Sequence, residues 1–129
     1  MELKIRTNKK TEVIDITQRV AEAVKAAQVT EGLCCIFIPH ATAAVVINEN
    51  DDMRIGLDLL DSLNKLIPEG VWRHDQIDSN GAAHLKAAVL GPSETVPVQN
   101  GRLALGTWQA IMLVELDGPR DRKVLVTVK

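Results

Sequence analysis

The sequence contains very few aromatic residues and no tyrosine. Its aromatic side chains are Phe37, Trp72 and Trp108, so a hydrophobic core has to be built from Val, Ile, Leu and Ala. So few rings offer no platform on which nucleic-acid bases could stack. A formal net charge of −2 supplies no positive field for a phosphate backbone either. We therefore expect no nucleic-acid partner.

Long apolar runs are also absent. The longest one, residues 33–38, is far shorter than the roughly 20 residues that a membrane-spanning helix needs. The first ten residues, MELKIRTNKK, lack the apolar region of a secretory signal. These absences predict a cytoplasmic protein without a membrane partner.

Cysteine occurs only twice, at the neighbouring positions Cys34 and Cys35. Adjacent side chains of a strand point to opposite faces of a sheet, which disfavours a disulfide between them. Two buried thiols in a cytoplasmic protein are the simpler interpretation.

The N-terminal part shows two kinds of apolar spacing. Residues 2–7 and 11–16 alternate between apolar and polar positions around a turn at residues 8–10, which predicts an N-terminal hairpin. Thr17 is the expected N-cap of a helix whose apolar residues follow at helical spacing and which ends before Gly32.

The middle of the chain predicts two buried strands and two helices. The apolar residues 33–38 and 43–48 favour buried strands. A long helix is expected after Asp51 and Asp52, because acids stabilise the start of a helix. Residues 71–81 have no clear period and predict a loop. A short helix is expected over residues 82–90.

Strands dominate the last third. Residues 94–99 and 102–115 flank Asn100 and Gly101, a strong hairpin signal, and residues 123–129 form a terminal strand. No repeat or linker interrupts the chain, so we expect one domain over residues 1–129. The order of elements predicts an α+β fold in which a mixed or mostly antiparallel sheet is covered by about three helices.

Histidine is also scarce, with His40, His74 and His84 as the only three. Each lies at the end of an element or in a loop, where functional residues concentrate. Three neutral imidazoles can bind a divalent metal and leave a position for water or substrate. Their spacing matches no metal motif, so separate surface or capping histidines are the alternative.

Charged side chains near turns supply further candidates. Glu49 ends an apolar strand and is a candidate metal ligand, orienting group or general base, or else a solvated acid before a helix. Arg102 and Arg120 lie beside turns, and Lys86 lies two residues after His84. Such cations suit phosphate binding, although surface arginines commonly serve solubility alone.

Ordered motifs along nearly the whole chain resemble the YjbQ-like proteins, also called the secondary thiamine-phosphate synthase family. Ala41 departs from the pattern, because the family commonly has Thr there, which removes a hydroxyl beside His40. The motifs that carry the resemblance are Pro39-His40-Ala41-Thr42-Ala43, Ile47-Asn48-Glu49-Asn50, His74-Asp75, Ala83-His84-Leu85-Lys86, Val96-Pro97-Val98, Gly101-Arg102-Leu103, Leu105-Gly106-Thr107-Trp108-Gln109 and the segment from Glu115 to Arg122.

The resemblance implies a compact α+β subunit that assembles as a homotrimer. It also implies that His40, His74 and His84 converge on a divalent metal, zinc or, with a diphosphate substrate, magnesium, with Glu49 near the site. The implied activity is that of a thiamine-phosphate synthase, a transferase that joins a pyrimidine methyl diphosphate to a thiazole phosphate and releases pyrophosphate. Arg102, Arg120 and Lys86 would then hold phosphates.

Two other functions fit the same residues. One is metal-assisted hydrolysis of a small phosphorylated or acyl metabolite, with Glu49 accepting a proton from the metal-bound water. The other is a trimer that binds a metal or metabolite without turnover. A small subunit has little room for a deep pocket, so we expect the site at or near a subunit boundary.

Overall fold

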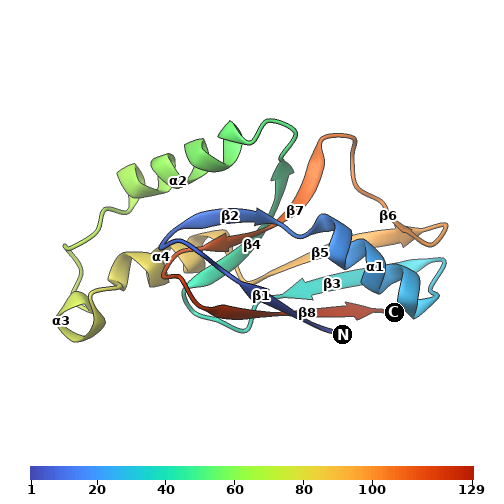
Figure 1. Ribbon diagram of the computed structural model, residues 1–129, viewed down its shortest axis with the longest axis horizontal. Helices are drawn as coiled ribbons and strands as arrows, with labels where there is room; N and C mark the ends of the chain where they lie inside the picture. Colours follow the sequence, from blue (N-terminus) through green and yellow to red (C-terminus); the bar gives the residue numbers. More distant parts are fainter.

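Two antiparallel sheets and four helices make up the fold in the computed structural model, which describes residues 1–129 (Figure 1). The larger sheet has the strand order β1-β8-β3-β5-β6 and the smaller one β2-β7-β4. The predicted α+β class is confirmed. In chain order the elements are β1 (Glu2–Arg6), β2 (Glu12–Asp15), α1 (Thr17–Ala27), β3 (Gly32–Phe37), β4 (Ala43–Glu49), α2 (Arg54–Leu66), α3 (Asp75–Asp78), α4 (Gly81–Leu90), β5 (Ser93–Gln99), β6 (Arg102–Leu103), β7 (Gln109–Glu115) and β8 (Asp121–Val128).

The main core lies between the two sheets and α1. Every second residue of β3 faces it, so Cys34 and Ile36 are buried while Leu33 and Phe37 are exposed. The helix α1 adds Val20 and its neighbours to the same cluster. Each large aliphatic side chain in it contributes roughly 1.5–3 kcal/mol by leaving water. The buried cluster contains no aromatic residue, as their scarcity in the sequence requires.

The smaller sheet is covered on its other face by α2 and α4 (Figure 1). Ala44 of β4 and Val114 of β7 pack there against Leu60 of α2 and Ala83 of α4. Because β7 is the central strand and has neighbours on both faces, its residues 110–115 are all buried. The smaller sheet is therefore the middle layer of the molecule.

The predicted N-terminal hairpin is wrong. β1 pairs with β8 in the larger sheet, and β2 pairs with β7 in the smaller one. The chain thus passes from one sheet to the other between Arg6 and Glu12. Alternating apolar residues identify a strand, but its partner is chosen by packing across the whole fold.

Two other local expectations are also corrected. The strand expected over residues 102–115 is divided into β6 and β7, which lie in different sheets. The Thr17 hydroxyl does not cap α1, because it accepts a hydrogen bond from the Ile111 N–H at 2.8 Å. The Asn100-Gly101 turn joins β5 to β6 as predicted, with both residues at positive φ.

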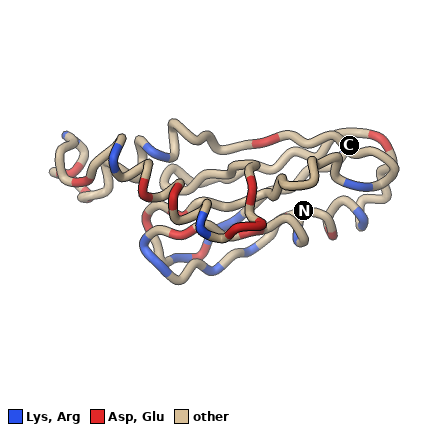
Figure 2. Tube along the Cα trace, turned by 90° about the horizontal axis from the view of Figure 1, so that it is seen from above, with Lys and Arg blue, Asp and Glu red and all other residues tan.

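Four further features bear on the expectations from the sequence. Leu33, Phe37 and Leu125 are exposed together on the outer face of the larger sheet, where Phe37 lies opposite Leu125 in register. Cys34 and Cys35 are free thiols, as expected, but only Cys34 is buried, whereas Cys35 is half-buried. No helix combines the length and the apolar character that crossing a membrane requires. Lys and Arg residues are interspersed with Asp and Glu along the chain (Figure 2).

Candidate functional site

His74 and His84 come together at the junction of α3 and α4. Their ring centroids lie 4.8 Å apart and the rings meet edge to face at 81°. His74 directly precedes α3, and His84 lies in the first turn of α4. The segment predicted as a loop therefore contains a one-turn helix, α3. The chain changes direction directly after it at Ser79, whose φ is 56°.

The Asp75 carboxylate holds this junction in shape. It accepts hydrogen bonds from the Trp72 N–H at 3.0 Å and from the Gly81 N–H at 2.8 Å. These donors lower the pKa of Asp75 below its ordinary value. A Cβ atom on Gly81 would lie 2.8 Å from the Trp72 Cβ and 2.9 Å from the Asp75 Oδ1, so the close approach requires glycine. The spacing of the two histidines thus depends on residues 72, 75 and 81.

The two histidines line an open pocket of about 690 Å³. The Nε2 atom of His74 is buried without a hydrogen-bond partner, and the nearest acid, Asp78, lies 3.6 Å away through its Oδ2. A buried nitrogen without a partner costs free energy, which a ligand can recover. The lining consists of Val71, Trp72, Arg73, His74, Gly81, His84 and Leu85.

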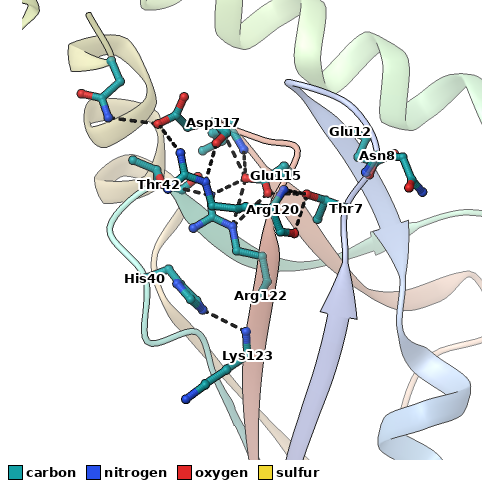
Figure 3. A network of polar contacts seen from close by, with 12 residues as sticks. Thr7, Asn8, Glu12, His40, Thr42, Glu115, Asp117, Arg120, Arg122 and Lys123 are labelled. Carbon is teal, nitrogen blue, oxygen red and sulfur yellow. Dashed lines mark hydrogen bonds and ion pairs between the residues drawn. The ribbon is translucent and has the colours of Figure 1, made fainter. Parts of the chain in front are cut away.

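His40 lies apart from this pair, in the loop between β3 and β4. Its Nε2 accepts a hydrogen bond from the backbone N–H of Lys123 at 2.9 Å (Figure 3). Burial and the neighbouring Arg122 charge lower the pKa of His40, so the imidazole is neutral at pH 7. A neutral imidazole has one acceptor nitrogen and one N–H. Since Nε2 is the acceptor, Nδ1 bears the proton, and His40 offers its surroundings a donor.

Within one chain the three histidines therefore do not converge. No group of three or more His, Cys, Asp or Glu side chains is arranged to hold a metal. Their convergence on one metal stays a prediction for assembled subunits, and it requires His40 to give up its hydrogen bond with Lys123.

A buried ion pair lies beside His40 and joins the two sheets. Arg122 of β8 donates through Nε to Glu115 of β7 at 2.9 Å, and its Nη2 contacts the same carboxylate (Figure 3). Nη2 also donates to the carbonyl and hydroxyl oxygens of Thr42 at 3.0 and 2.9 Å. Thr7 donates to Glu115 at 2.7 Å. Burial alone would raise the pKa of Glu115, but hydrogen bonds from Arg122 and Thr7 lower it.

The remaining predicted site residues are dispersed. Arg120 lies close to the ion pair, and its Nε and Nη2 donate to Asp117. Lys86 points away from the pocket into the layer between α4 and α2, where it is 3% exposed and donates to Asn64. Burial lowers the pKa of Lys86.

Glu49 and Arg102 lie far from the histidines. Glu49 ends β4, whose first residue follows the His40 loop. The two ends of β4, Ala43 and Glu49, are roughly 20 Å apart because a strand rises about 3.3 Å per residue. Arg102 lies on the β5–β6 hairpin, beside α1 (Figure 1). Within one chain, neither contributes to the pocket of His74 and His84.

Sequence reasoning missed the Arg122–Glu115 pair as part of the site. The alternation of β8 could have indicated it, because Arg122 lies on the same face of the strand as the buried Val124 and Val126. Glu115 likewise ends the buried run of β7. Charged residues at core positions are seldom buried unless they are paired.

Comparisons with known proteins place this geometry in a family. The family model described as "UPF0047 protein YjbQ-like" matches residues 1–129. A UPF0047 protein of Archaeoglobus fulgidus is 48% identical over 127 residues, which cover 98% of each chain. The UPF0047 protein YugU of Bacillus subtilis is 42% identical and covers 93% of this chain and 91% of its own.

Solved structures agree with these relatives. A YjbQ/UPF0047 protein of Clostridium acetobutylicum superposes with a TM-score of 0.96 at 42% identity, and the match covers 100% of this chain and 99% of that one. A hypothetical protein of Aeropyrum pernix gives a TM-score of 0.96 at 38% identity, covering 100% and 96%. Sequence and fold agree over the full length, and the chain belongs to the UPF0047, YjbQ-like family.

Proposed function

We propose that the protein is a metal-dependent enzyme that acts on a small phosphorylated metabolite, with His74 and His84 as two ligands of the metal. The observation that supports this most directly is the pair of imidazoles on the wall of one pocket, one of which has a buried nitrogen without a partner. Imidazole nitrogen is the commonest protein ligand of zinc and similar cations.

The residues present fit such a cation in part. Two imidazoles supply two positions, and a bound cation would give the His74 Nε2 the partner that it lacks. Within one chain no third His, Cys, Asp or Glu side chain is placed to complete a metal site with these two. The other positions are left for water, for substrate, or for a residue of a second copy, with Glu49 and His40 as the candidates that the family resemblance suggests.

The pocket itself suggests how the chain's own residues act. His74 and His84 would hold the cation, and Asp75 fixes their positions through the backbone of residues 72 and 81. Trp72 and Leu85 line the open pocket and offer apolar surface to a substrate. A divalent metal bound there supplies positive charge for oxygens that become more negative as a phosphate leaves.

The resemblance narrows the proposed reaction to the formation of thiamine phosphate. The ring nitrogen of the thiazole phosphate forms a bond to the methylene carbon of the pyrimidine. The bond from that carbon to the diphosphate oxygen breaks, and pyrophosphate leaves with the electron pair. The protein's task is then to orient the two substrates and stabilise the leaving group.

We further propose that the chain works as a homotrimer. The exposed Leu33, Phe37 and Leu125 form an apolar area on the outer sheet face, and soluble proteins commonly bury such areas against partners. A closed assembly would also bring a second chain within reach of incomplete sites. The predicted placement of the metal at a subunit boundary depends on this assembly.

The metal is tested in protein purified without a histidine tag, by measuring bound metal and by titrating zinc into chelator-treated protein. We expect tight binding that His74→Ala and His84→Ala each reduce strongly. Arg54→Ala is the control, because Arg54 is exposed and pairs only with Asp52. Binding that is unchanged in both histidine variants would refute the proposed ligands.

The reaction is tested separately. Purified protein is given both substrates, and thiamine phosphate is followed over time. Product that forms in the wild type and not in His84→Ala supports the transferase. No product above the His84→Ala control refutes it. Turnover of a single phosphate ester without a second substrate would identify a hydrolase instead.

A further inference from the structure

The loop between β3 and β4 contains a group of hydrogen-bond donors that no acceptor of the chain satisfies. It surrounds the Arg122 guanidinium and lies apart from the His74–His84 pair. Three independent parts of the structure contribute to it: an arginine nitrogen, a run of backbone N–H groups and the ring of His40.

Arg122 is the most constrained of these donors. Its side chain is 2% exposed, and its Nε and Nη2 are held by Glu115 and Thr42. The remaining nitrogen, Nη1, has no hydrogen-bond partner in the chain. Unlike the His74 Nε2, it is accessible from the surface. A rigidly held guanidinium with one free edge is well suited to bind an oxygen anion.

The backbone of the loop supplies further donors. No backbone hydrogen bond of the chain uses the N–H groups of His40, Ala41 or Thr42. Thr42 is only 5% exposed, and its carbonyl is occupied by the Leu116 N–H and by Arg122. Of the three residues only Thr42 is buried, whereas His40 is half-buried and Ala41 is exposed. Buried N–H groups are nearly always paired in native proteins, so the unused Thr42 N–H points to an acceptor from outside the chain. Successive free N–H groups are a common way to bind anions.

His40 completes the group. Because its Nε2 accepts the Lys123 N–H, its Nδ1 is a donor. Figure 3 shows its ring beside Arg122 and below the Thr42 loop. Each acid in the network of Figure 3 is already occupied. Glu115 accepts from Arg122, Thr7 and two backbone N–H groups, Asp117 accepts from Arg120 and Asn80, and Glu12 accepts from the Asn8 N–H. The donors around the loop therefore have no competing carboxylate.

We infer that the Arg122 Nη1, the His40 Nδ1–H and the backbone N–H groups of residues 40–42 form a binding site for a phosphate-type oxyanion. This gives His40 the role of a neutral donor to the anion, which is an alternative to the ligand role that the family resemblance suggests for it. The inference deepens the proposed function, because the site would hold a phosphoryl group of the metabolite. It does not depend on the metal, since none of its donors belongs to the His74–His84 pair.

The test uses the full-length protein after removal of metal by a chelator, with inorganic phosphate as the probe. Phosphate is titrated while the backbone amide resonances are followed by NMR. We expect saturable shifts at residues 40–42. His40→Gln keeps an acceptor near the Nε2 position but loses the Nδ1–H donor, and we expect it to weaken phosphate binding about tenfold or more.

Arg122→Lys keeps the charge but loses the Nη1 donor, and we expect a similar loss. Because Arg122 is buried, its variant is first checked for a folded spectrum, and His40→Gln provides the independent second result. Arg54→Lys is the matched control for an exposed arginine and is expected to bind phosphate as the wild type does.

Three results would overturn the inference. One is an absence of saturable phosphate binding in metal-free protein. The second is unchanged affinity in both His40→Gln and Arg122→Lys. The third is binding that requires added metal and is lost in His84→Ala, which would place the anion on the metal. Failure of zinc binding with phosphate binding intact would refute the proposed metal site and leave the oxyanion site standing.

Discussion

Replacing Glu115 by Gln should destabilise the protein far more than any surface substitution. Glu115 is fully buried, and its carboxylate accepts hydrogen bonds from Thr7, from Arg122 and from the backbone N–H groups of residues 116 and 117. A glutamine has the same shape but replaces one of these oxygens by an NH2 group. The NH2 group is itself a donor and would face the donors that surround the carboxylate now. The buried Arg122 charge would also lose the negative charge that it pairs with.

The expected magnitude follows from the burial of both groups. Removing one partner of a buried ion pair costs about 3–5 kcal/mol. Small domains unfold with a free energy of roughly 5–15 kcal/mol. The variant should therefore lose a large share of its stability, and its Tm should fall by about 10–20 °C. Urea unfolding followed by circular dichroism measures the free energy directly.

The surface variant Glu69→Gln serves as the control. Glu69 pairs with Lys10 at the surface, where both side chains are more than half exposed. Such pairs contribute about 0–1 kcal/mol. A loss below 1 kcal/mol in Glu115→Gln would refute the reasoning. Replacing both members of the buried pair, as in Glu115→Met with Arg122→Met, should cost less than Glu115→Gln, because no charge is then left unpaired.

The same carboxylate makes stability depend on pH. The pKa of Glu115 is lowered in the folded state, so the unfolded chain binds a proton more readily. The contribution of Glu115 is fully present above the ordinary glutamate pKa of about 4.3 and is lost as the pH falls through the lower value of the folded state. Urea unfolding between pH 7 and pH 3 should show this loss in the wild type and a smaller loss in Glu115→Gln, where carboxylates such as Asp75, whose pKa is also lowered, still contribute.

Three further predictions address other parts of the molecule. Gly81→Ala should cost about 1–3 kcal/mol by overpacking against Trp72 and Asp75, and should weaken zinc binding because it displaces His84; unchanged affinity would contradict the tight junction. Phe37→Asp should reduce the assembled mass measured by light scattering without unfolding the subunit, whereas an unchanged mass would place the interface elsewhere. Lys86→Met should leave stability in urea equal or higher, because burial disfavours the ammonium, and a large loss would show that its contact with Asn64 is essential.

Local pattern was sufficient for most individual elements. Alternation in β3 identified its buried face, helical spacing identified α1 and α2, and Asn100-Gly101 identified its hairpin turn. These features depend on interactions between residues close in the chain, so a single sequence contains the information. The predicted hairpin of β1 and β2 is wrong for the same reason. Their partners, β8 and β7, lie about a hundred residues away and are selected by the packing of both sheets.

The candidate site, too, was predictable only in part from the sequence. The sequence by itself determined that any histidine chemistry rests on His40, His74 and His84, and that the core is aliphatic. Only the tertiary structure decided that His74 meets His84 while His40 turns its Nε2 toward Lys123. The physical reason is that neither contact follows from local pattern: one depends on how the chain reverses between α3 and α4, and the other joins segments far apart in the sequence. The α3–α4 junction places one pair of side chains in contact, and the β3–β8 packing fixes the hydrogen bond that determines which nitrogen of His40 is free.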